Sequence, residues 1–278
     1  MTVTGDLAEQ LRTAVQALAE THRLVEGVNG RVKALEAELA ALREQSSRPP
    51  NGAGDRFAAL YDDFTDRFRG STADVTAKLR GYLPEVHRLV GAGGAVDLGS
   101  GRGEWLMLLR DAGLKASGVD PNPAFVGAAR ERGLEVSLGD AVGHLQDLPP
   151  DSVDLVTAFH VIEHLDTEEL LALMEAALTA LRAGGCLLLE TPNPTNLVMA
   201  ACDFYNDPTH RSPLPPALVE YLVSSQGFVE VEVRPLHPTL PSVQADPAAA
   251  QLPEPVWRRL FGPQDYAVLG YKPPSSAA

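Results

Sequence analysis

Residues 93–104 read GGAVDLGSGRGE, and this stretch decides the fold. The apolar run that ends at Asp97 is typical of a buried strand, and the glycines that follow indicate a sharp turn into a helix. Glycines are needed where the chain turns tightly and where a ligand presses on bare backbone. The stretch therefore predicts a strand, a ligand-binding turn and a helix.

The spacing of the glycines indicates which ligand the turn binds. A dinucleotide fold normally carries G-x-G-x-x-G, which seats a pyrophosphate on a helix N-terminus. Here the pattern is G-x-G-x-G at Gly99, Gly101 and Gly103, with Asp97 two residues before the first glycine. A carboxylate in that place suits a cation and would repel pyrophosphate. S-adenosylmethionine, which carries an ammonium and a sulfonium but no phosphate, is the ligand that this pattern favours.

Two more acids end the next two predicted strands. Asp120 ends the second strand, where a carboxylate can accept both ribose hydroxyls, and Asp140 follows the third strand, beside Ala141. An acid at the position of Asp140 can accept a hydrogen bond from the adenine amino group. Each of these acids could instead be a helix cap, but together they predict one crevice at the carboxyl edge of the sheet.

Strands and helices alternate through the rest of the chain, which predicts an α/β fold with a Rossmann-like, doubly wound and mostly parallel sheet. The last two predicted strands show polar alternation and suit an antiparallel C-terminal edge. Asp166 and Glu169 form a predicted capping box, and Gly184-Gly185 is expected to end the helix. Strands are expected at 93–99, 115–120, 134–140, 153–159, 186–192, 229–236 and 265–272, and helices at 72–90, 103–113, 123–132, 141–147, 167–182 and 215–226.

The N-terminal region has a different pattern. Apolar residues recur in heptads over 1–45, which predicts a coiled-coil helix and a homodimer or higher oligomer formed through it. Gly27 and Gly30 interrupt the heptads, so a hairpin or an amphipathic helix on its own domain are alternatives. Residues 46–54 have the composition of a linker, and the catalytic domain is expected over 55–278.

Composition limits the partners. The net charge is −14, so nucleic acid and anionic membranes are poor candidates. The sequence has neither an apolar run long enough for a membrane span nor a secretory signal at its start, and its two cysteines do not suggest a disulfide framework. We therefore expect a cytoplasmic protein.

The ordered motifs resemble those of class I S-adenosylmethionine-dependent methyltransferases. They span residues 93–196 and read VDLGSGRGEW, GVDPNP, LGDA, FHVIEHL and LRAGGCLLLETPNP. FRGS at 68–71 and FYNDPTHRSPLPP at 204–216 are similar to segments of bacterial enzymes that methylate O-antigen and other polysaccharides, and of actinobacterial mannoside methyltransferases. The resemblance implies O-methylation of a sugar hydroxyl. It also implies that segment 196–216 shapes the saccharide pocket.

The catalytic residues are expected after the fourth strand. His160, Glu163 and His164 are spaced so that one helical turn would gather them, and a histidine is well placed as a base near neutral pH. The resemblance implies that His164 is the base. Some relatives bind a divalent metal at E-x-x-E-H and a later histidine, which implies a possible Mg²⁺ site at Glu163, His164 and His210, with Asp207 as a further candidate.

The donor is expected to contact a larger set of residues. Arg69 could clamp the donor carboxylate or the acceptor, and His160 could also pack over the adenosine. The full expected set is Arg69, Asp97, Gly99, Gly101, Asp120, Asp140, Ala141 and His160.

Four other functions are compatible with parts of the sequence. The acceptor could be a phosphate at a glycan terminus or a hydroxyl of another small molecule. H-V-I-E-H at 160–164 also fits the H-x-x-E-H pattern of inverted zinc peptidases, although it leaves a strand directly. A non-catalytic scaffold is the fourth alternative.

Overall fold

The computed structural model describes residues 70–238 and 252–274. The expected coiled coil at 1–45, the linker at 46–54 and Arg69 lie outside the described residues. No helix in the described part of the chain has the length and apolar content that crossing a bilayer requires.

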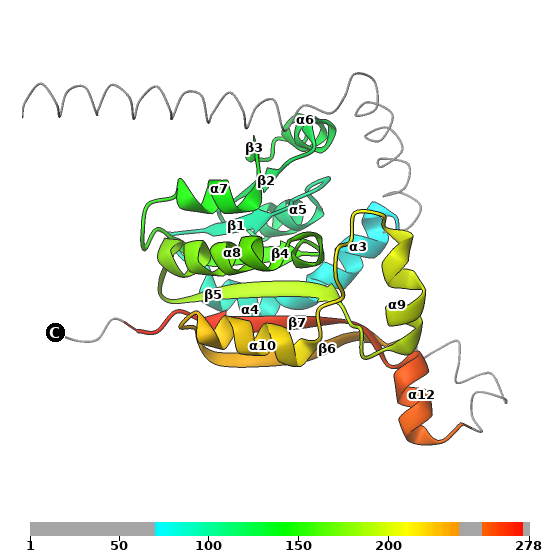
Figure 1. Cartoon of the computed structure of the whole chain (residues 1–278). Helices are drawn as coiled ribbons and strands as arrows, with labels where there is room; N and C mark the ends of the chain where they lie inside the picture. The colour runs from blue at the N-terminus through cyan, green and yellow to red at the C-terminus, as the bar shows by residue number, and fades with distance from the viewer. Residues whose placement is uncertain (1–69, 239–251, 275–278) are drawn as a thin grey trace, which may run out of the picture. The chain divides into compact units, whose positions relative to one another are not determined.

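Seven strands form a single mixed sheet in the order β3-β2-β1-β4-β5-β7-β6 (Figure 1). The first five strands in this order pair in parallel, whereas β7 is antiparallel to both of its neighbours. The Rossmann-like α/β fold with an antiparallel C-terminal edge is therefore confirmed. The strands are β1 (Ala95–Leu98), β2 (Ala116–Asp120), β3 (Val136–Leu138), β4 (Val153–Phe159), β5 (Leu181–Pro192), β6 (Val229–Pro238) and β7 (Pro263–Tyr271).

Helices cover both faces of the sheet (Figure 1). One hydrophobic core joins the sheet to α7 (Ala141–Gln146), α8 (Thr167–Ala180) and α10 (Pro216–Ser225). On the other face, the core contains residues of α3 (Thr72–Leu79), α4 (Leu83–Leu89) and α5 (Glu104–Asp111), with α6 (Pro123–Glu131) in a smaller cluster beside α5. The sheet is therefore buried on both faces, as parallel sheets normally are.

Two of the expected helices differ from the prediction in their bounds. The helix expected at 72–90 is divided into α3, the 3₁₀ turn η1 (Arg80–Tyr82) and α4. The predicted capping box starts α8, but α8 ends at Ala180 rather than at Gly184-Gly185, because Leu181 already pairs with β4 as part of β5. Within the confirmed antiparallel edge, β7 lies between β5 and β6, so β6 is the outermost strand and the middle residues of β7 are buried.

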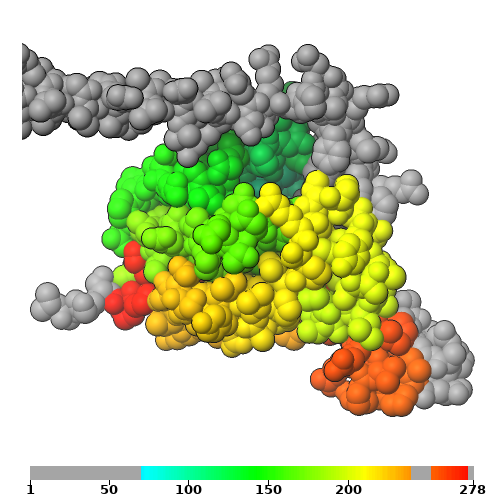
Figure 2. Space-filling model, in the orientation of Figure 1, coloured from blue at the N-terminus to red at the C-terminus, as the bar shows by residue number. Residues whose placement is uncertain are grey.

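Short helices that the sequence did not predict lie at one end of the sheet. They are α9 (Leu197–Ala201), η3 (Asp203–Asn206) and α12 (Glu254–Phe261). In Figure 2 the yellow residues of α9 and η3 form one wall, with the orange residues of α12 beside it. Buried Asn196 connects this wall to the sheet, because its side chain caps α9 and donates to the carbonyl of Gly262. The wall stands beyond the carboxyl ends of β4 and β5, where ligands bind in such sheets (Figure 1).

Candidate active site

A cavity of about 360 Å³ opens at the carboxyl end of the parallel strands. Pockets for small ligands span roughly 300–1,000 Å³, so this cavity has a suitable size. Asp97, Gly99 and Gly101 line one half of it, which we call the donor half. Residues that follow β4 and β5, residues of segment 199–210 and the start of β7 line the other half, which we call the acceptor half.

The glycine turn shapes the donor half. Gly99 and Gly101 have φ angles of +64° and +54°, a backbone conformation that favours glycine. A β-carbon on Gly99 would lie 2.6 Å from a methyl group of Val161, whereas one on Gly101 would meet no protein atom within 4 Å. Gly99 is therefore required by packing, and Gly101 leaves open space for a ligand.

Asp120 holds this turn in place. Its carboxylate accepts hydrogen bonds from the backbone N–H groups of Gly101, at 2.7 Å, and Asn122, at 2.8 Å. The side chain is 5% exposed and is not among the residues that line the cavity. Each carboxylate oxygen has a second lone pair, so ribose binding by Asp120 is compatible with these contacts and stays a prediction.

Asp97 lies in the wall of the donor half. Thr157 donates a hydrogen bond of 2.7 Å to its carboxyl group, which is 3% exposed. Burial raises the pKa of Asp97 to about 8; the bond from Thr157 lowers it, and the nearby charges of Asp120 and Glu104 raise it further. A cationic group bound next to Asp97 would favour the ionised form.

Two other residues of the expected donor set lie outside the cavity lining. Asp140 is exposed and caps α7, where it accepts a hydrogen bond of 2.7 Å from the backbone N–H of Gly143. Ala141 is the first residue of that helix and packs against the core. The helix-cap alternative for Asp140 is therefore realised, and its contact with adenine stays a prediction.

His160 lies between two buried glutamates. Its Nδ1 is 3.3 Å from Oε1 of Glu163, and its Nε2 is 3.6 Å from Oε1 of Glu190. Burial alone would lower the pKa of His160, but the contacts with Glu163 and Glu190 outweigh burial and raise it to about 10. The ring lines the cavity, and the two neighbouring carboxylates favour its protonated form.

The expected helical turn through His160, Glu163 and His164 is wrong. His160 has a left-handed backbone, with φ at +56°, and the 3₁₀ turn η2 (Ile162–His164) begins only two residues later. The backbone N–H of His160 donates to the carbonyl of Glu190, so β4 is still paired with β5 at this point. His160 consequently lies between Glu163 and Glu190, whereas the ring of His164 contacts Thr209.

Glu163, His164 and His210 do come together. One ligand atom from each lies within 4.8 Å of the other two, and the two imidazole rings are 4.7 Å apart between centroids. Glu163 is fully buried; its Oε2 accepts a hydrogen bond from Thr191, whereas Oε1 accepts none. Burial opposes ionisation of Glu163, but the contact with His160 and the charges of His160 and His164 lower its pKa. Only His210 of these three lines the cavity.

The hydrogen bonds of the two histidines determine which ring nitrogens carry protons. The one proton of the Thr209 hydroxyl points to the Asp207 carboxylate, 2.5 Å away, so Nδ1 of His164 donates to the same hydroxyl at 2.9 Å. Nδ1 of His210 lies 2.6 Å from the carbonyl of Phe204, which can only accept. The neutral form of either ring would therefore carry its lone pair on Nε2.

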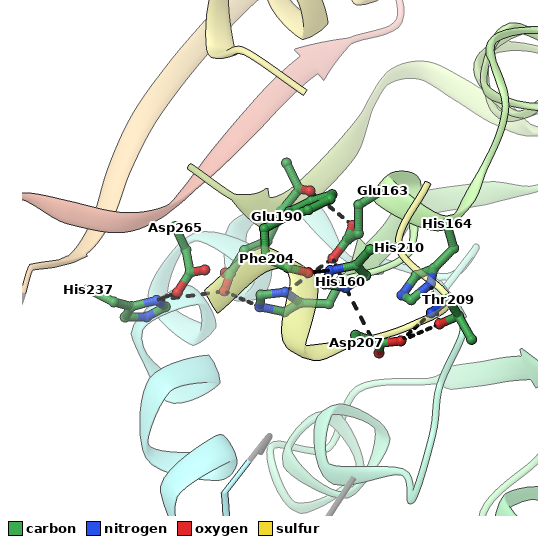
Figure 3. Close-up of polar contacts among 11 residues, drawn as sticks. His160, Glu163, His164, Glu190, Phe204, Asp207, Thr209, His210, His237 and Asp265 are labelled. Carbon is green, nitrogen blue, oxygen red and sulfur yellow. Dashed lines mark hydrogen bonds and ion pairs between the residues drawn. The ribbon is translucent and has the colours of Figure 1, made fainter. Parts of the chain in front are cut away.

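Apart from His160, a second group of titratable side chains was missed by the sequence analysis. The group forms a row across four adjacent strand regions, β4, β5, β7 and β6, which contribute His160, Glu190, Asp265 and His237 in that order. In Figure 3 the His160 end of this row faces His164 and Thr209. His237 Nδ1 is 2.8 Å from Asp265, and the hydroxyl of Tyr82 donates to Glu190. Burial opposes ionisation of Asp265, but the bond from His237 and nearby cationic charges lower its pKa.

One member of this row could have been found from the sequence. Glu190 lies two residues before the end of the strand CLLLETP, close to the carboxyl edge where Asp120 was identified. Asp265 and His237 carried no comparable signal, because their position depends on the antiparallel pairing of β6 and β7.

Residues 69–232 match a protein family described as a methyltransferase domain. A curated relative, a probable S-adenosylmethionine-dependent methyltransferase of Mycolicibacterium smegmatis, is 34% identical over 153 residues. That alignment covers 54% of this chain and 57% of the relative, so the chain spans little more than half of that protein's length.

Solved structures agree with the family match. A SAM-dependent methyltransferase from Archaeoglobus fulgidus is 32% identical, with a TM-score of 0.66, and the alignment covers 76% of this chain and 99% of that one. The fold is also shared with a phosphoethanolamine N-methyltransferase of Haemonchus contortus in complex with S-adenosyl-L-methionine. That protein is 17% identical, with a TM-score of 0.51, and the alignment covers 77% of this chain and 60% of that one. The chain belongs to the methyltransferase domain family, and it is a class I methyltransferase that uses S-adenosylmethionine.

Proposed function

We propose that this methyltransferase transfers the methyl group of S-adenosylmethionine to a hydroxyl of a saccharide or a glycan precursor. The observation that carries this proposal is the polarity of the acceptor half. Its lining includes the carboxylates of Glu190, Asp203, Asp207 and Asp265. Carboxylates and side-chain amides accept hydrogen bonds, and a saccharide offers many hydroxyl donors.

The same lining argues against a phosphate acceptor. Four carboxylates would repel a phosphate monoester, and Lys78 and Arg102 are the only lysine and arginine in the lining among the described residues. Arg102 is already paired with Glu104 at 2.7 Å. An apolar small molecule would also fit poorly, because polar and charged residues outnumber Phe159, Pro192 and Met199 in the lining of this half.

The peptidase alternative is not supported by the local fold. Inverted zinc peptidases place H-x-x-E-H within a helix, where two turns present both histidines to one metal. Here His160 precedes a 3₁₀ turn of three residues and contacts Glu190, whereas His164 contacts Thr209. The pair does not converge on one site.

The donor half fits S-adenosylmethionine. The open space at Gly101 admits a ligand against the backbone, and the buried carboxyl group of Asp97 can pair with an ammonium. The bound donor supplies a methyl group already activated on a sulfonium. We propose that Asp97 binds the donor ammonium and that Asp120 binds the ribose. Gly99 and Gly101 allow the donor to approach the backbone closely. Asp140 and Ala141 remain the residues proposed for the adenine.

The chain must also orient the acceptor hydroxyl and remove its proton. We assign this task to the cluster of Glu163, His164 and His210, because it borders the acceptor half through His210. The base predicted from the sequence, His164, would act through Nε2. Mg²⁺ fits the cluster poorly: it prefers oxygen ligands in a strict octahedron, whereas two of the three donors are imidazoles. No step is assigned to Mg²⁺.

Methyl transfer to a defined acceptor panel tests this function. The full chain is incubated with methyl-labelled S-adenosylmethionine and with neutral oligosaccharides, sugar phosphates or simple alcohols, and the product is analysed by NMR. We expect a methyl ether on a neutral saccharide. A methyl ester on phosphate, label only on a simple alcohol, or donor binding without any transfer would each contradict the proposal.

A further inference from the structure

A gap between His160 and Glu190 lies in the wall of the acceptor half. Both residues line the cavity, and Glu190 is 3% exposed. Oε1 of Glu190 is 3.6 Å from Nε2 of His160 and 3.8 Å from Nδ1 of His237. Both distances exceed the length of a hydrogen bond, so a group that bridges these atoms would improve their pairing. A buried carboxylate oxygen is costly to leave without a close donor, and the gap therefore favours a ligand that supplies one.

The two carboxylates at this place are held from outside the cavity. The hydroxyl of Tyr82 donates to Oε2 of Glu190, which leaves Oε1 for the gap. Burial and the charge of Glu190 raise the pKa of Tyr82, so this hydroxyl keeps its proton. Nδ1 of His237 lies 2.8 Å from Oδ2 of Asp265, which is 5% exposed and also lines the cavity. Both carboxylates are thus fixed before any ligand arrives.

His160 contributes a hydrogen-bond donor to the gap. Its Nδ1 faces Glu163 at 3.3 Å and its Nε2 faces Glu190, so both ring nitrogens are next to acceptors (Figure 3). These contacts favour the ring that carries a proton on each nitrogen. The backbone of His160 is left-handed, and such conformations outside glycine cluster at functional sites.

A hydroxyl group matches both sides of the gap. The bridging group must accept a hydrogen bond from Nε2 of His160 and donate one to Oε1 of Glu190. A hydroxyl does both, as water does, whereas an ether oxygen only accepts and an ammonium only donates. An ionised phosphate oxygen cannot donate and would be repelled by Glu190. The gap therefore selects a ligand that carries hydroxyl groups.

The carboxylate of Asp265 limits how far apart two bound hydroxyls can be. One polar atom from each of His160, Glu190 and Asp265 lies within 4.8 Å of the other two. A hydroxyl in the gap and a second hydroxyl on Asp265 must therefore be close neighbours. Hydroxyls on adjacent carbons of a sugar ring meet this requirement, whereas hydroxyls on opposite sides of the ring do not.

We propose that His160, Glu190 and Asp265 form a subsite that binds a vicinal diol of the saccharide, beside the hydroxyl that is methylated. One hydroxyl of the diol bridges His160 and Glu190, and the other donates to Asp265. On the opposite side of His160, Glu163 leads to Nε2 of His210, 3.8 Å from its Oε1, where the reacting hydroxyl is expected. The inference rests on the proposed function and adds to it the class of saccharide, one with two free neighbouring hydroxyls.

Sugar binding is measured separately from methyl transfer. The full chain is loaded with S-adenosylhomocysteine and titrated with methyl hexopyranosides, followed by NMR, and then with each monodeoxy derivative of the one that binds best. We expect two derivatives, deoxygenated at adjacent carbons, to bind at least about tenfold more weakly, because each loses hydrogen bonds to charged groups. Equal binding of all derivatives, or losses only at carbons that are not adjacent, would overturn the inference.

Two variants locate the diol. His160→Asn is compatible with the left-handed backbone, and Glu190→Gln keeps an oxygen that accepts from Tyr82. Each should weaken the parent sugar about tenfold and remove most of the further loss caused by deoxygenation at the bridging carbon. His87→Asn, at an exposed histidine of α4, should change neither value. Unchanged S-adenosylhomocysteine affinity shows that the variants are folded. If deoxygenation cost as much in both variants as in the unchanged protein, the diol would bind elsewhere.

The same sugars, tested as methyl acceptors, separate this inference from the proposed function. If a sugar binds with the expected pattern but receives no methyl group, the subsite stands and the proposed function fails. If a saccharide is methylated equally well without its neighbouring hydroxyls, the proposed function stands and the inference fails. Sugar binding that a chelator abolishes and a divalent cation restores would place a metal in the gap and contradict the inference. No binding of any sugar would contradict both.

Discussion

The donor half of the cavity is built from residues close together in the sequence, whereas the acceptor half collects side chains from distant segments. Asp97, Gly99 and Gly101 lie in one turn, and Asp120 braces that turn from the next strand. His160, His210 and Asp265 come from separate parts of the chain. A binding site made by one local turn can be recognised in a sequence, but one made by tertiary contacts is recognised only in part.

The largest effect is expected from Asp120→Ala. This change removes the acceptor of the Gly101 N–H and the proposed ribose contact together. Two hydrogen bonds to a charged group contribute about 3 kcal/mol, or roughly 100-fold in affinity. Calorimetry should show this loss for S-adenosylmethionine, with Glu131→Ala at the exposed end of α6 as the control. Unchanged donor affinity would show that the donor half is not where we place it.

A smaller effect, on the other ligand, is expected from Asp265→Asn. The amide keeps the shape of the side chain but replaces charge-assisted hydrogen bonds with neutral ones, which are about half as strong. The KM of the acceptor should rise about tenfold, while the affinity for S-adenosylmethionine should not change. Glu254→Gln on α12 is the matched exposed control. If the donor affinity fell instead, the division of the cavity into two halves would be wrong.

Asp97 couples donor binding to pH. Its carboxyl group, with a pKa of about 8, is mostly protonated at pH 7 in the free protein and should ionise when the donor ammonium binds. Close to one proton should therefore be released at pH 7, and the ionisation of Asp97 should by itself contribute a roughly tenfold rise in affinity between pH 7 and 9. Calorimetry in buffers of different ionisation enthalpy measures this release, and Asp97→Asn should abolish it.

The same carboxyl group should make stability depend on pH. The folded-state pKa of Asp97 lies above the unfolded value of about 4, so its contribution is fully present below pH 4 and is lost as pH rises through 8. Asp97→Asn should consequently raise the Tm at pH 9 more than at pH 5. An equal effect at both values would contradict the raised pKa.

The smallest effect is expected at Asp140, where capping and adenine binding can be separated. Asp140→Ala removes the cap of α7 and should cost about 1 kcal/mol of stability. Asp140→Ser retains a capping oxygen but cannot reach as far, so stability should be kept while donor affinity falls about twofold. If the donor affinity of Asp140→Ser equalled that of the unchanged protein, Asp140 would act only as a helix cap.

Most of the fold could be predicted from the sequence, because hydrophobic periodicity and turn residues are local properties. The glycine turn, the strand β4 and the capping box at Asp166 are examples. The end of α8 could not be predicted, since Leu181 is drawn into the sheet by its pairing with Val153. The interior position of β7 likewise follows from strand order, which no local pattern encodes.

The candidate site was predicted unevenly for the same reason. The grouping of Glu163, His164 and His210 was expected from a motif and is present, although Glu163 and His164 do not line the cavity. His160 was expected to share a helical turn with them, but its backbone is left-handed, and its ring lies between Glu163 and Glu190. Asp265 and His237 were missed because only the pairing of β6 and β7 brings them there.

A crystal structure with S-adenosylhomocysteine would test the division of the cavity most directly. We predict that its amino acid part lies against Gly99 and Gly101 with the ammonium near Asp97, and that its sulfur faces the half lined by His160 and His210. A ligand whose sulfur points away from His210, or which lies on the Asp265 side of the cavity, would contradict this account.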